Sequence, residues 1–208
     1  YIPEPDISTS AMKVKIILKN GKKIPITEQY FPSGKIRAIT EYNLKVKDED
    51  IEKNDIRKFY TSNKLGQNIY SSIITETYYE SGKLKSRMTD TGDKGKLEGY
   101  YENGNLITEA NLVNEKMGEL TKTYPEGIVK AYYPNGTLKS KIEFKKGLAN
   151  GIYETYYENG NIFENTTMKN GKPDGKYEVY GPDGKYEVYG PDGKLEENIF
   201  YKNGEVVK

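Results

Sequence analysis

The sequence contains no cysteine, no histidine and no tryptophan among its 208 residues. Without cysteine there is neither a disulfide framework nor a thiol nucleophile. Without histidine the commonest general base and metal ligand is missing. No apolar run reaches the roughly 18 residues that a membrane-spanning helix needs. We therefore expect a protein that is not an enzyme and that holds no cofactor and no metal.

An excess of either charge is also lacking. The chain has 32 basic and 31 acidic residues, which gives a net charge of +1. A nucleic-acid-binding protein normally carries a basic excess on one face, and a membrane-surface segment needs clustered lysine and arginine. We therefore expect no nucleic-acid partner and consider membrane binding disfavoured. With nucleic acid and membrane disfavoured, we expect a protein partner, whose identity the sequence does not reveal.

One short phrase recurs along the chain, most clearly as Tyr156-Tyr157-Glu158-Asn159-Gly160-Asn161-Ile162. Two aromatic residues lead into a turn that ends in glycine, and an aliphatic residue follows two positions later. Recurrence at 22 to 24 residues is typical of repeat architectures. Shorter steps of nine residues, from Gly127 to Gly136 and from Gly184 to Gly193, predict unusually short strands near 128–133 and 185–190. The glycines of the phrase are Gly34, Gly82, Gly104, Gly127, Gly136, Gly160, Gly184 and Gly193.

A second turn lies about eleven residues after the first, at Lys145-Lys146-Gly147, Lys169-Asn170-Gly171 and Lys202-Asn203-Gly204. Near the N-terminus, Asn20-Gly21 between apolar runs is a strong hairpin signal. Apolar and small residues alternate with period two on both sides of each first turn, which indicates strands. The sequence thus predicts an all-β fold, an elongated antiparallel meander of stacked β-hairpin repeats forming a long, twisted single-layer sheet of the solenoid-like repeat class.

The alternation leaves open which face of the sheet is buried. A three-residue turn ending in a left-handed glycine puts the apolar series before and after the turn on opposite faces. An even-numbered loop puts both series on one face. Because a shift of one residue moves every side chain to the other face, both arrangements stay open at this point.

The array has irregular parts. Residues 1–12 contain Pro3, Pro5 and Asp6, lack periodicity and are interpreted as a loose leader. Residues 13–208 form a single repeat array, interrupted by a charged insertion at about 43–58. A degraded copy of the phrase follows at residues 59–65, where Asn63 replaces glycine. The leader fits a mature exported protein, periplasmic or at the cell surface, and equally a trimmed N-terminus.

Two rows of side chains are candidates for a partner-binding surface. Every phrase except the one ending in Gly127 has tyrosine four residues before its glycine, and most have glutamate six residues before it. Aromatic rows are typical contact anchors, but they also stabilise sheets across strands by about 0.2–1 kcal/mol per pair. Both interpretations remain. The candidate residues are Tyr30, Tyr78, Tyr100, Tyr132, Tyr156, Tyr180 and Tyr189, with Glu76, Glu98, Glu154 and Glu178.

The phrase and its second turn, Tyr-Tyr-x-Asn-Gly-x-Leu followed by Lys-Asn-Gly-Lys, resemble the MORN-repeat variant of many bacterial proteins. The resemblance runs from about residue 13 to 208, with Gly171, Gly175 and Tyr177 in the glycine-glycine-aromatic part of the motif. It implies stacked hairpins in one sheet. The usual tryptophan and histidine are absent, which weakens an inherited membrane role. Similarity to lipid kinases is confined to the repeats and implies no kinase activity.

The resemblance and the residues together favour a non-catalytic repeat scaffold that mediates protein–protein interaction. Some proteins of the family are antitoxin components, so neutralisation of a partner toxin is the alternative, with a cytoplasmic location. Phosphoinositide or membrane-surface binding and a structural spacer at the cell surface are further alternatives.

Overall fold

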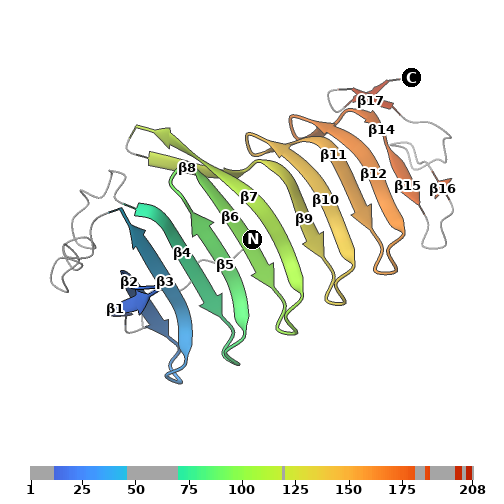
Figure 1. Cartoon of the computed structure of the whole chain (residues 1–208). Helices are drawn as coiled ribbons and strands as arrows, with labels where there is room; N and C mark the ends of the chain where they lie inside the picture. The colour runs from blue at the N-terminus through green and yellow to red at the C-terminus, as the bar shows by residue number, and fades with distance from the viewer. Residues whose placement is uncertain are drawn as a thin grey trace. The chain divides into compact units, whose positions relative to one another are not determined.

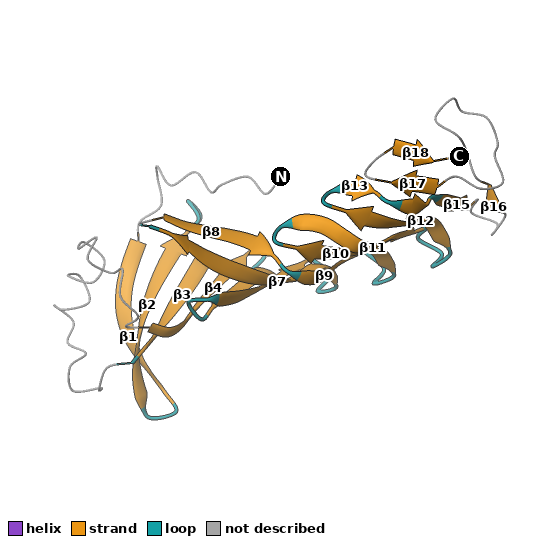
Figure 2. Cartoon of the chain, turned by 90° about the horizontal axis from the view of Figure 1, so that it is seen from above, coloured by secondary structure: helices purple, strands orange, loops and turns teal. Residues whose placement is uncertain are grey.

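The computed structural model describes residues 12–45, 70–118, 120–180, 186–187, 200–202 and 205–207. These residues form antiparallel strands and contain no helix (Figures 1 and 2), as the sequence predicts. None of them forms a helix with the length and apolar character of a membrane-spanning segment. The contacts divide the chain into two compact units, Tyr1–Gly95 and Lys96–Lys208.

The first unit is a meander in which each strand pairs with the next one in the sequence (Figure 1). Its strands form one layer, so little of the unit is deeply buried (Figure 2). Among its hydrophobic side chains Ile24 and Ile26 are the most buried, at 7% and 5% exposed. The strands are β1 (Met12–Lys19), β2 (Lys22–Tyr30), β3 (Ile36–Leu44), β4 (Tyr70–Tyr78) and β5 (Leu84–Asp90).

The second unit repeats this arrangement and adds a side branch. Its main path runs β6-β7-β9-β10-β11-β12-β15-β16, with β8 paired to β7 and β13 paired to β12. A small separate sheet contains β14, β17 and β18. The strands are β6 (Lys94–Tyr100), β7 (Leu106–Met117), β8 (Leu120–Pro125), β9 (Gly127–Tyr132), β10 (Leu138–Lys145), β11 (Leu148–Tyr156), β12 (Ile162–Lys169), β13 (Lys172–Pro173), β14 (Gly175–Lys176), β15 (Glu178–Tyr180), β16 (Tyr186–Glu187), β17 (Phe200–Lys202) and β18 (Glu205–Val207).

In the described repeats the first turn is a three-residue loop, one of the two arrangements that the sequence leaves open. At the β4–β5 turn the Gly82 N–H donates to the Tyr79 carbonyl, and the Tyr79 N–H donates to the Lys83 carbonyl, both at 2.8 Å. Gly82 has φ of 89°, in the left-handed region that glycine enters without steric cost. The same two hydrogen bonds occur at the turns ending in Gly34, Gly104, Gly136 and Gly160.

A β-bulge after four of these turns, those ending in Gly34, Gly82, Gly136 and Gly160, settles which side chains share a face. Residues directly opposite each other in an antiparallel pair point to the same side. Tyr78 pairs with Leu84 but Thr77 pairs with Ser86, so Lys85 is an extra residue in β5. The equivalent bulged residues are Arg37, Lys139 and Phe163.

The bulge reverses the alternation once and cancels the effect of the odd-numbered loop. In the second unit Ile142 therefore pairs with Val129 on one side and with Tyr153 on the other. The apolar positions six and eight after the glycine thus share a face with positions five and seven before it. The aliphatic residue two after the glycine lies on the opposite face, with the first tyrosine of the phrase.

The second turns are two-residue loops of the kind that Asn-Gly predicts. Asn20 and Gly21 have φ of 51° and 76°, and Asn170 and Gly171 have 51° and 80°. Positive φ at both central residues is the mark of the type I′ turn, whose twist matches that of the flanking strands. The pairing of Lys19 with Lys22 closes the first of these hairpins.

The prediction that Gly127 ends a first turn is wrong. Strands β8 and β9, on either side of Glu126, both pair with β7, so the chain continues through Gly127 as a kinked strand. The φ of Gly127 is 80°, and Gly151 and Gly175 at the start of later repeats are also positive, at 119° and 133°. Gly127 therefore corresponds to Gly151, and the nine residues to Gly136 are an ordinary repeat step.

The predicted short strand near 128–133 is present as β9 (Gly127–Tyr132), which has six residues. The array begins with Met12 in β1, and β3 continues through Asn43 and Leu44, two residues into the range assigned to the insertion. Residues 46–58 of the insertion, the phrase at 59–65 and Tyr189 lie outside the described residues. Of the range 185–190, only the backbone of Tyr186 and Glu187 is described.

Candidate functional site

The predicted tyrosine and glutamate rows are bonded to each other. Strand alternation places the tyrosine four residues before the glycine on the same side as the residue two positions earlier in its strand. The Tyr78 hydroxyl donates to Glu76 Oε2 at 2.6 Å, and the Tyr156 hydroxyl donates to Glu154 Oε2 at 2.7 Å. Tyr30 bonds Glu28 in the same way, and Tyr180 bonds Glu178 at 3.1 Å. We call this surface of each unit the Tyr–Glu face.

Most of these glutamates also bind a neighbouring cation, which completes a three-residue cluster. Lys15 Nζ lies 2.6 Å from Glu28 Oε2, and Arg87 Nη2 lies 2.7 Å from Glu76 Oε1. Lys141 Nζ lies 3.3 Å from Glu154 Oε2. The cations come from the adjacent strands, so each cluster ties two strands together across the face.

Tyr132 departs from the rule because lysine, Lys130, occupies the position two residues before it. Glu109 of the adjacent strand β7 supplies the missing carboxylate, since Glu109 pairs directly with Lys130. Its Oε1 accepts from the Tyr132 hydroxyl at 2.8 Å and lies 3.2 Å from Lys130 Nζ. Sequence reasoning missed Glu109 because the substitution is visible only across the strand pair.

The clusters shift the pKa values of both partners. Burial, and then the hydrogen bond to Glu109, raise the pKa of Tyr132 to about 12. Burial, and then the hydrogen bond to Glu154, raise the pKa of Tyr156 to about 12 as well. The hydrogen bond from Tyr132 lowers the pKa of Glu109, with Lys130 adding to the effect against desolvation. The ionised carboxylate and the neutral phenol are therefore the stable pair at neutral pH.

The other predicted site residues have different surroundings. Glu98 is ion-paired with Lys96, whose Nζ lies 2.8 Å from Glu98 Oε1. Glu178 accepts from the Asn165 amide at 3.0 Å. Tyr100, like the other described tyrosines of the row, is half-buried. The structure therefore presents tyrosine rings whose hydroxyls are largely engaged within the sheet.

A second tyrosine row, missed as a set from the sequence, joins successive repeats. The tyrosine three residues before the glycine donates its hydroxyl to the main-chain carbonyl of the first tyrosine in the next repeat. Tyr101 reaches the Tyr132 carbonyl at 3.0 Å, and Tyr133 reaches the Tyr156 carbonyl at 2.8 Å. Tyr157 bonds the Tyr180 carbonyl at 2.9 Å. The doubled tyrosine of the phrase was the available signal, since both positions recur.

The first turns are linked in the same direction by asparagine side chains. Asn103 Nδ2 donates to the Pro134 carbonyl at 2.8 Å, and Asn135 Nδ2 donates to the Glu158 carbonyl at 3.4 Å. The Oδ1 atoms of Asn103 and Asn135 accept from the main-chain N–H two residues later, at 3.0 and 2.8 Å. These contacts fix each asparagine in its turn.

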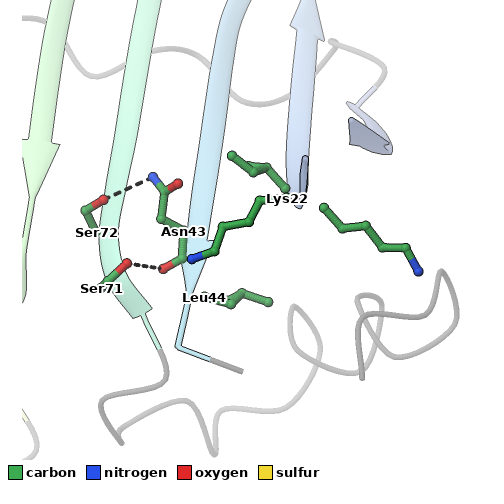
Figure 3. Close-up of a pocket in the computed structure, with 7 residues that line it drawn as sticks. Lys22, Asn43, Leu44, Ser71 and Ser72 are labelled. Atoms are coloured by element: carbon green, nitrogen blue, oxygen red, sulfur yellow. Dashed lines mark hydrogen bonds between the residues drawn. The ribbon is translucent and has the colours of Figure 1, made fainter. Parts of the chain in front are cut away.

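A hollow of about 280 Å³ lies in the first unit, where β2, β3 and β4 meet the start of the insertion (Figure 3). The Asn43 amide donates to Ser72 Oγ, and Ser71 Oγ donates to the Asn43 carbonyl, both at 3.0 Å. Lys22, Lys23, Ile24 and Leu44 complete the lining. No group of three acidic residues suited to a metal ion occurs in the part of the chain that the structure describes.

Within the described part of the second unit, the β7–β8 hairpin departs from the repeat (Figure 1). Strand β7 spans 12 residues, and its last six pair with β8. Met117 and Leu120, on either side of the hairpin tip, are 60% and 75% exposed.

The sequence model of the MORN repeat variant family matches the chain in six places, at residues 26–44, 73–89, 94–114, 125–146, 149–170 and 182–203. The chain belongs to the MORN repeat variant family. The fourth and fifth matches begin two residues before Gly127 and Gly151 respectively, which agrees with the equivalence of these glycines in the structure. A comparison with curated proteins finds no significant match. MORN repeats are in general non-catalytic, and their presence is consistent with a scaffold or binding role.

Proposed function

We propose that this MORN-repeat chain is a non-catalytic scaffold that binds a protein partner through the Tyr–Glu face. The observation that carries the proposal is the set of fixed tyrosine rings, each held by a carboxylate on its own or an adjacent strand. Tyr78, Tyr132 and Tyr156 illustrate the arrangement, with hydrogen bonds of 2.6 to 2.8 Å.

A side chain that is already fixed before binding loses less conformational entropy on association. Tyrosine also contributes a large, rigid ring at a low cost in conformational entropy. The rings on the Tyr–Glu face are half-buried, so each still has exposed surface for a partner. Repetition along each unit would let an extended or repetitive protein surface engage several rings at once.

The charges on this face favour a protein rather than an anionic lipid. Lysines and arginines such as Arg87 and Lys130 are neutralised by glutamates within 2.7 and 3.2 Å. Binding to a phosphoinositide surface depends on a basic excess, which these ion pairs remove. A partner toxin, as the family resemblance implies, is one concrete form of the protein partner.

The test replaces Tyr100, Tyr132 and Tyr156 by serine and compares partner capture by the variant and the parent. A matched variant replaces Tyr101, Tyr133 and Tyr157, which are adjacent in sequence and bond main-chain carbonyls instead. Circular dichroism and thermal unfolding of both variants separate binding from stability. We expect the first variant to lose its partner while it keeps most of its strand signal.

Equal capture by the first variant and the parent would remove the Tyr–Glu face from consideration. Loss of stability in the first variant with no change in capture would instead support a purely structural spacer. Flotation of the parent with phosphoinositide-containing liposomes would support the membrane alternative.

A further inference from the structure

We propose that Asn20 is a site of spontaneous deamidation, from which the folded chain protects its other described Asn–Gly pairs. The inference is independent of the proposed function. Asn–Gly is the sequence in which this reaction is easiest, because glycine has no side chain to obstruct the attacking nitrogen. The described pairs are Asn20–Gly21, Asn103–Gly104, Asn135–Gly136, Asn150–Gly151, Asn159–Gly160 and Asn170–Gly171. The Asn150–Gly151 pair lies within strand β11, whose main chain is held by pairing with both β10 and β12.

The reaction needs only water. The glycine main-chain nitrogen loses its proton and attacks Cγ of the asparagine, so that a nitrogen–Cγ bond forms. The Cγ–Nδ2 bond breaks and ammonia leaves, taking up a proton, which gives a five-membered succinimide. Water then opens either carbonyl of the ring to give aspartate or isoaspartate. A site is therefore protected when the glycine N–H or the asparagine amide is held in a hydrogen bond.

The first turns protect both the glycine N–H and the asparagine side chain from ring closure. The glycine N–H donates to a carbonyl three residues earlier, at 2.9 Å for Gly104, 2.8 Å for Gly136 and 2.9 Å for Gly160. The side-chain oxygen of each preceding asparagine accepts a main-chain N–H, at 3.0, 2.8 and 2.9 Å respectively. In these turns neither the nucleophile nor the electrophilic carbon is free to move.

The second turns protect their asparagines less than the first turns do, and the Asn20 turn is less protected than the Asn170 turn. Neither Asn20 nor Asn170 makes a side-chain hydrogen bond within the described ranges, and both are exposed. The Gly171 N–H nevertheless donates to the Ala149 carbonyl of the neighbouring strand β11 at 2.8 Å. The Gly21 N–H has no acceptor in the part of the chain that is described.

The difference follows from the position of β1 in its sheet. A second turn inside the array lies beside the start of the preceding hairpin, whose carbonyl accepts the glycine N–H. Among the described strands β1 pairs only with β2, so none of them lies beside the Asn20 turn to supply such a carbonyl. Ring closure also requires Asn20 to leave its left-handed conformation, and a hairpin paired on one side opens at a lower free-energy cost.

The product would change the first hairpin. Isoaspartate inserts an additional carbon into the main chain, which a two-residue type I′ turn cannot accommodate in register. The pairing of Lys19 with Lys22 and the ion pair of Lys19 with Glu41, 2.9 Å long, lie next to the turn. We expect deamidation to fray β1 and to leave the second unit unchanged.

The test incubates the folded chain at mildly alkaline pH and maps peptides by mass spectrometry after cleavage at glutamate. Labelling with an isoaspartyl methyltransferase distinguishes isoaspartate from aspartate. We expect Asn20 to react at least about tenfold faster than Asn103, Asn135 and Asn159, with Asn170 between them; tenfold corresponds to about 1.4 kcal/mol in activation free energy. The same chain in denaturant is the control, and there we expect the six sites to react at similar rates.

A rate at Asn20 no greater than that at Asn103 in the folded chain would overturn the proposal. A faster reaction at Asn170 than at Asn20 would also overturn it, because the Gly171 hydrogen bond would then offer no protection. The Asn20→Gln variant, which lengthens the side chain and disfavours ring closure, should abolish the earliest product and leave the other sites unchanged.

Discussion

The hydroxyl of Tyr132 donates to Glu109 Oε1, on the adjacent strand, at 2.8 Å. The corresponding Tyr78, Tyr156 and Tyr180 instead bond a glutamate two residues earlier in their own strand. The exchange accompanies Lys130, which occupies the usual glutamate position and lies 3.2 Å from the same carboxylate. The cluster of tyrosine, carboxylate and cation is thus kept, but here the carboxylate comes from the adjacent strand and the cation from the strand of the tyrosine.

The exchange can be tested by reversing it. We expect Glu109→Gln to destabilise the chain by about 0.5–1.5 kcal/mol, since it weakens hydrogen bonds to a charged group. The double variant Glu109→Lys with Lys130→Glu should recover much of the stability lost in either single change, because it restores the usual pattern. Urea unfolding measures each value, and a double variant no better than the sum of its parts would contradict the pairing.

Alkaline titration should distinguish the tyrosines. Tyr132 and Tyr156 have pKa values of about 12 in the folded chain, against 10.0 for the unperturbed phenol. Because the folded pKa is raised, the associated stability is present below pH 10 and lost as pH rises toward 12. Phenolate absorbance should show a late-titrating class that shrinks in Tyr132→Phe. Titration of all tyrosines near pH 10 in the folded chain would contradict this assignment.

Acid should weaken the same clusters from the carboxylate side. The hydrogen bond from Lys15, and then that from Tyr30, lower the pKa of Glu28, and the Tyr132 hydrogen bond lowers the pKa of Glu109. A depressed folded pKa gives stability that is present above the unfolded value, near 4.3, and lost as pH falls through the folded value. Thermal unfolding of Glu109→Gln should depend less on pH in this range than that of the parent.

Two glycines with positive φ should differ in their tolerance of alanine. A Cβ atom at Gly151, where φ is +119°, would lie 2.0 Å from Glu143 Oε2, whereas a Cβ at Gly104 would meet nothing within 4 Å. Both changes strain the backbone by about 1–3 kcal/mol, and Gly151→Ala adds a steric conflict. We expect Gly151→Ala to be the more destabilising in chemical denaturation. Adding Glu143→Ala to it should recover part of the difference, measured against Glu143→Ala alone.

The tip of the β7–β8 hairpin should tolerate polar substitution. Met117 and Leu120 are 60% and 75% exposed, so replacing both by serine removes little buried surface. We expect the free energy of unfolding to change by no more than about 0.5 kcal/mol and solubility at high concentration to increase. A large destabilisation, compared with serine at the half-buried Val113, would show that the tip packs against the chain.

The sequence by itself determined the strand content, the hairpin repeat and the two-residue Asn-Gly turns. These depend on a few adjacent residues: glycine at a left-handed position, Asn-Gly between apolar runs, and alternation with period two. Asn20-Gly21 and the turn ending in Gly82 follow from such local chemistry alone. The row of tyrosines and its accompanying glutamates could likewise be placed from their spacing.

Only the tertiary structure decided how the strands pair. The bulge at Lys85 fixes which side chains share a face, and it arises from the register of two strands rather than from the turn. Gly127 resembles a turn glycine in sequence but lies within a strand, because β8 and β9 both find their partner in β7. The replacement of a same-strand glutamate by Glu109 is equally invisible along the chain. In each case a one-residue change in register decides the outcome, and register is set by contacts between residues far apart in the sequence.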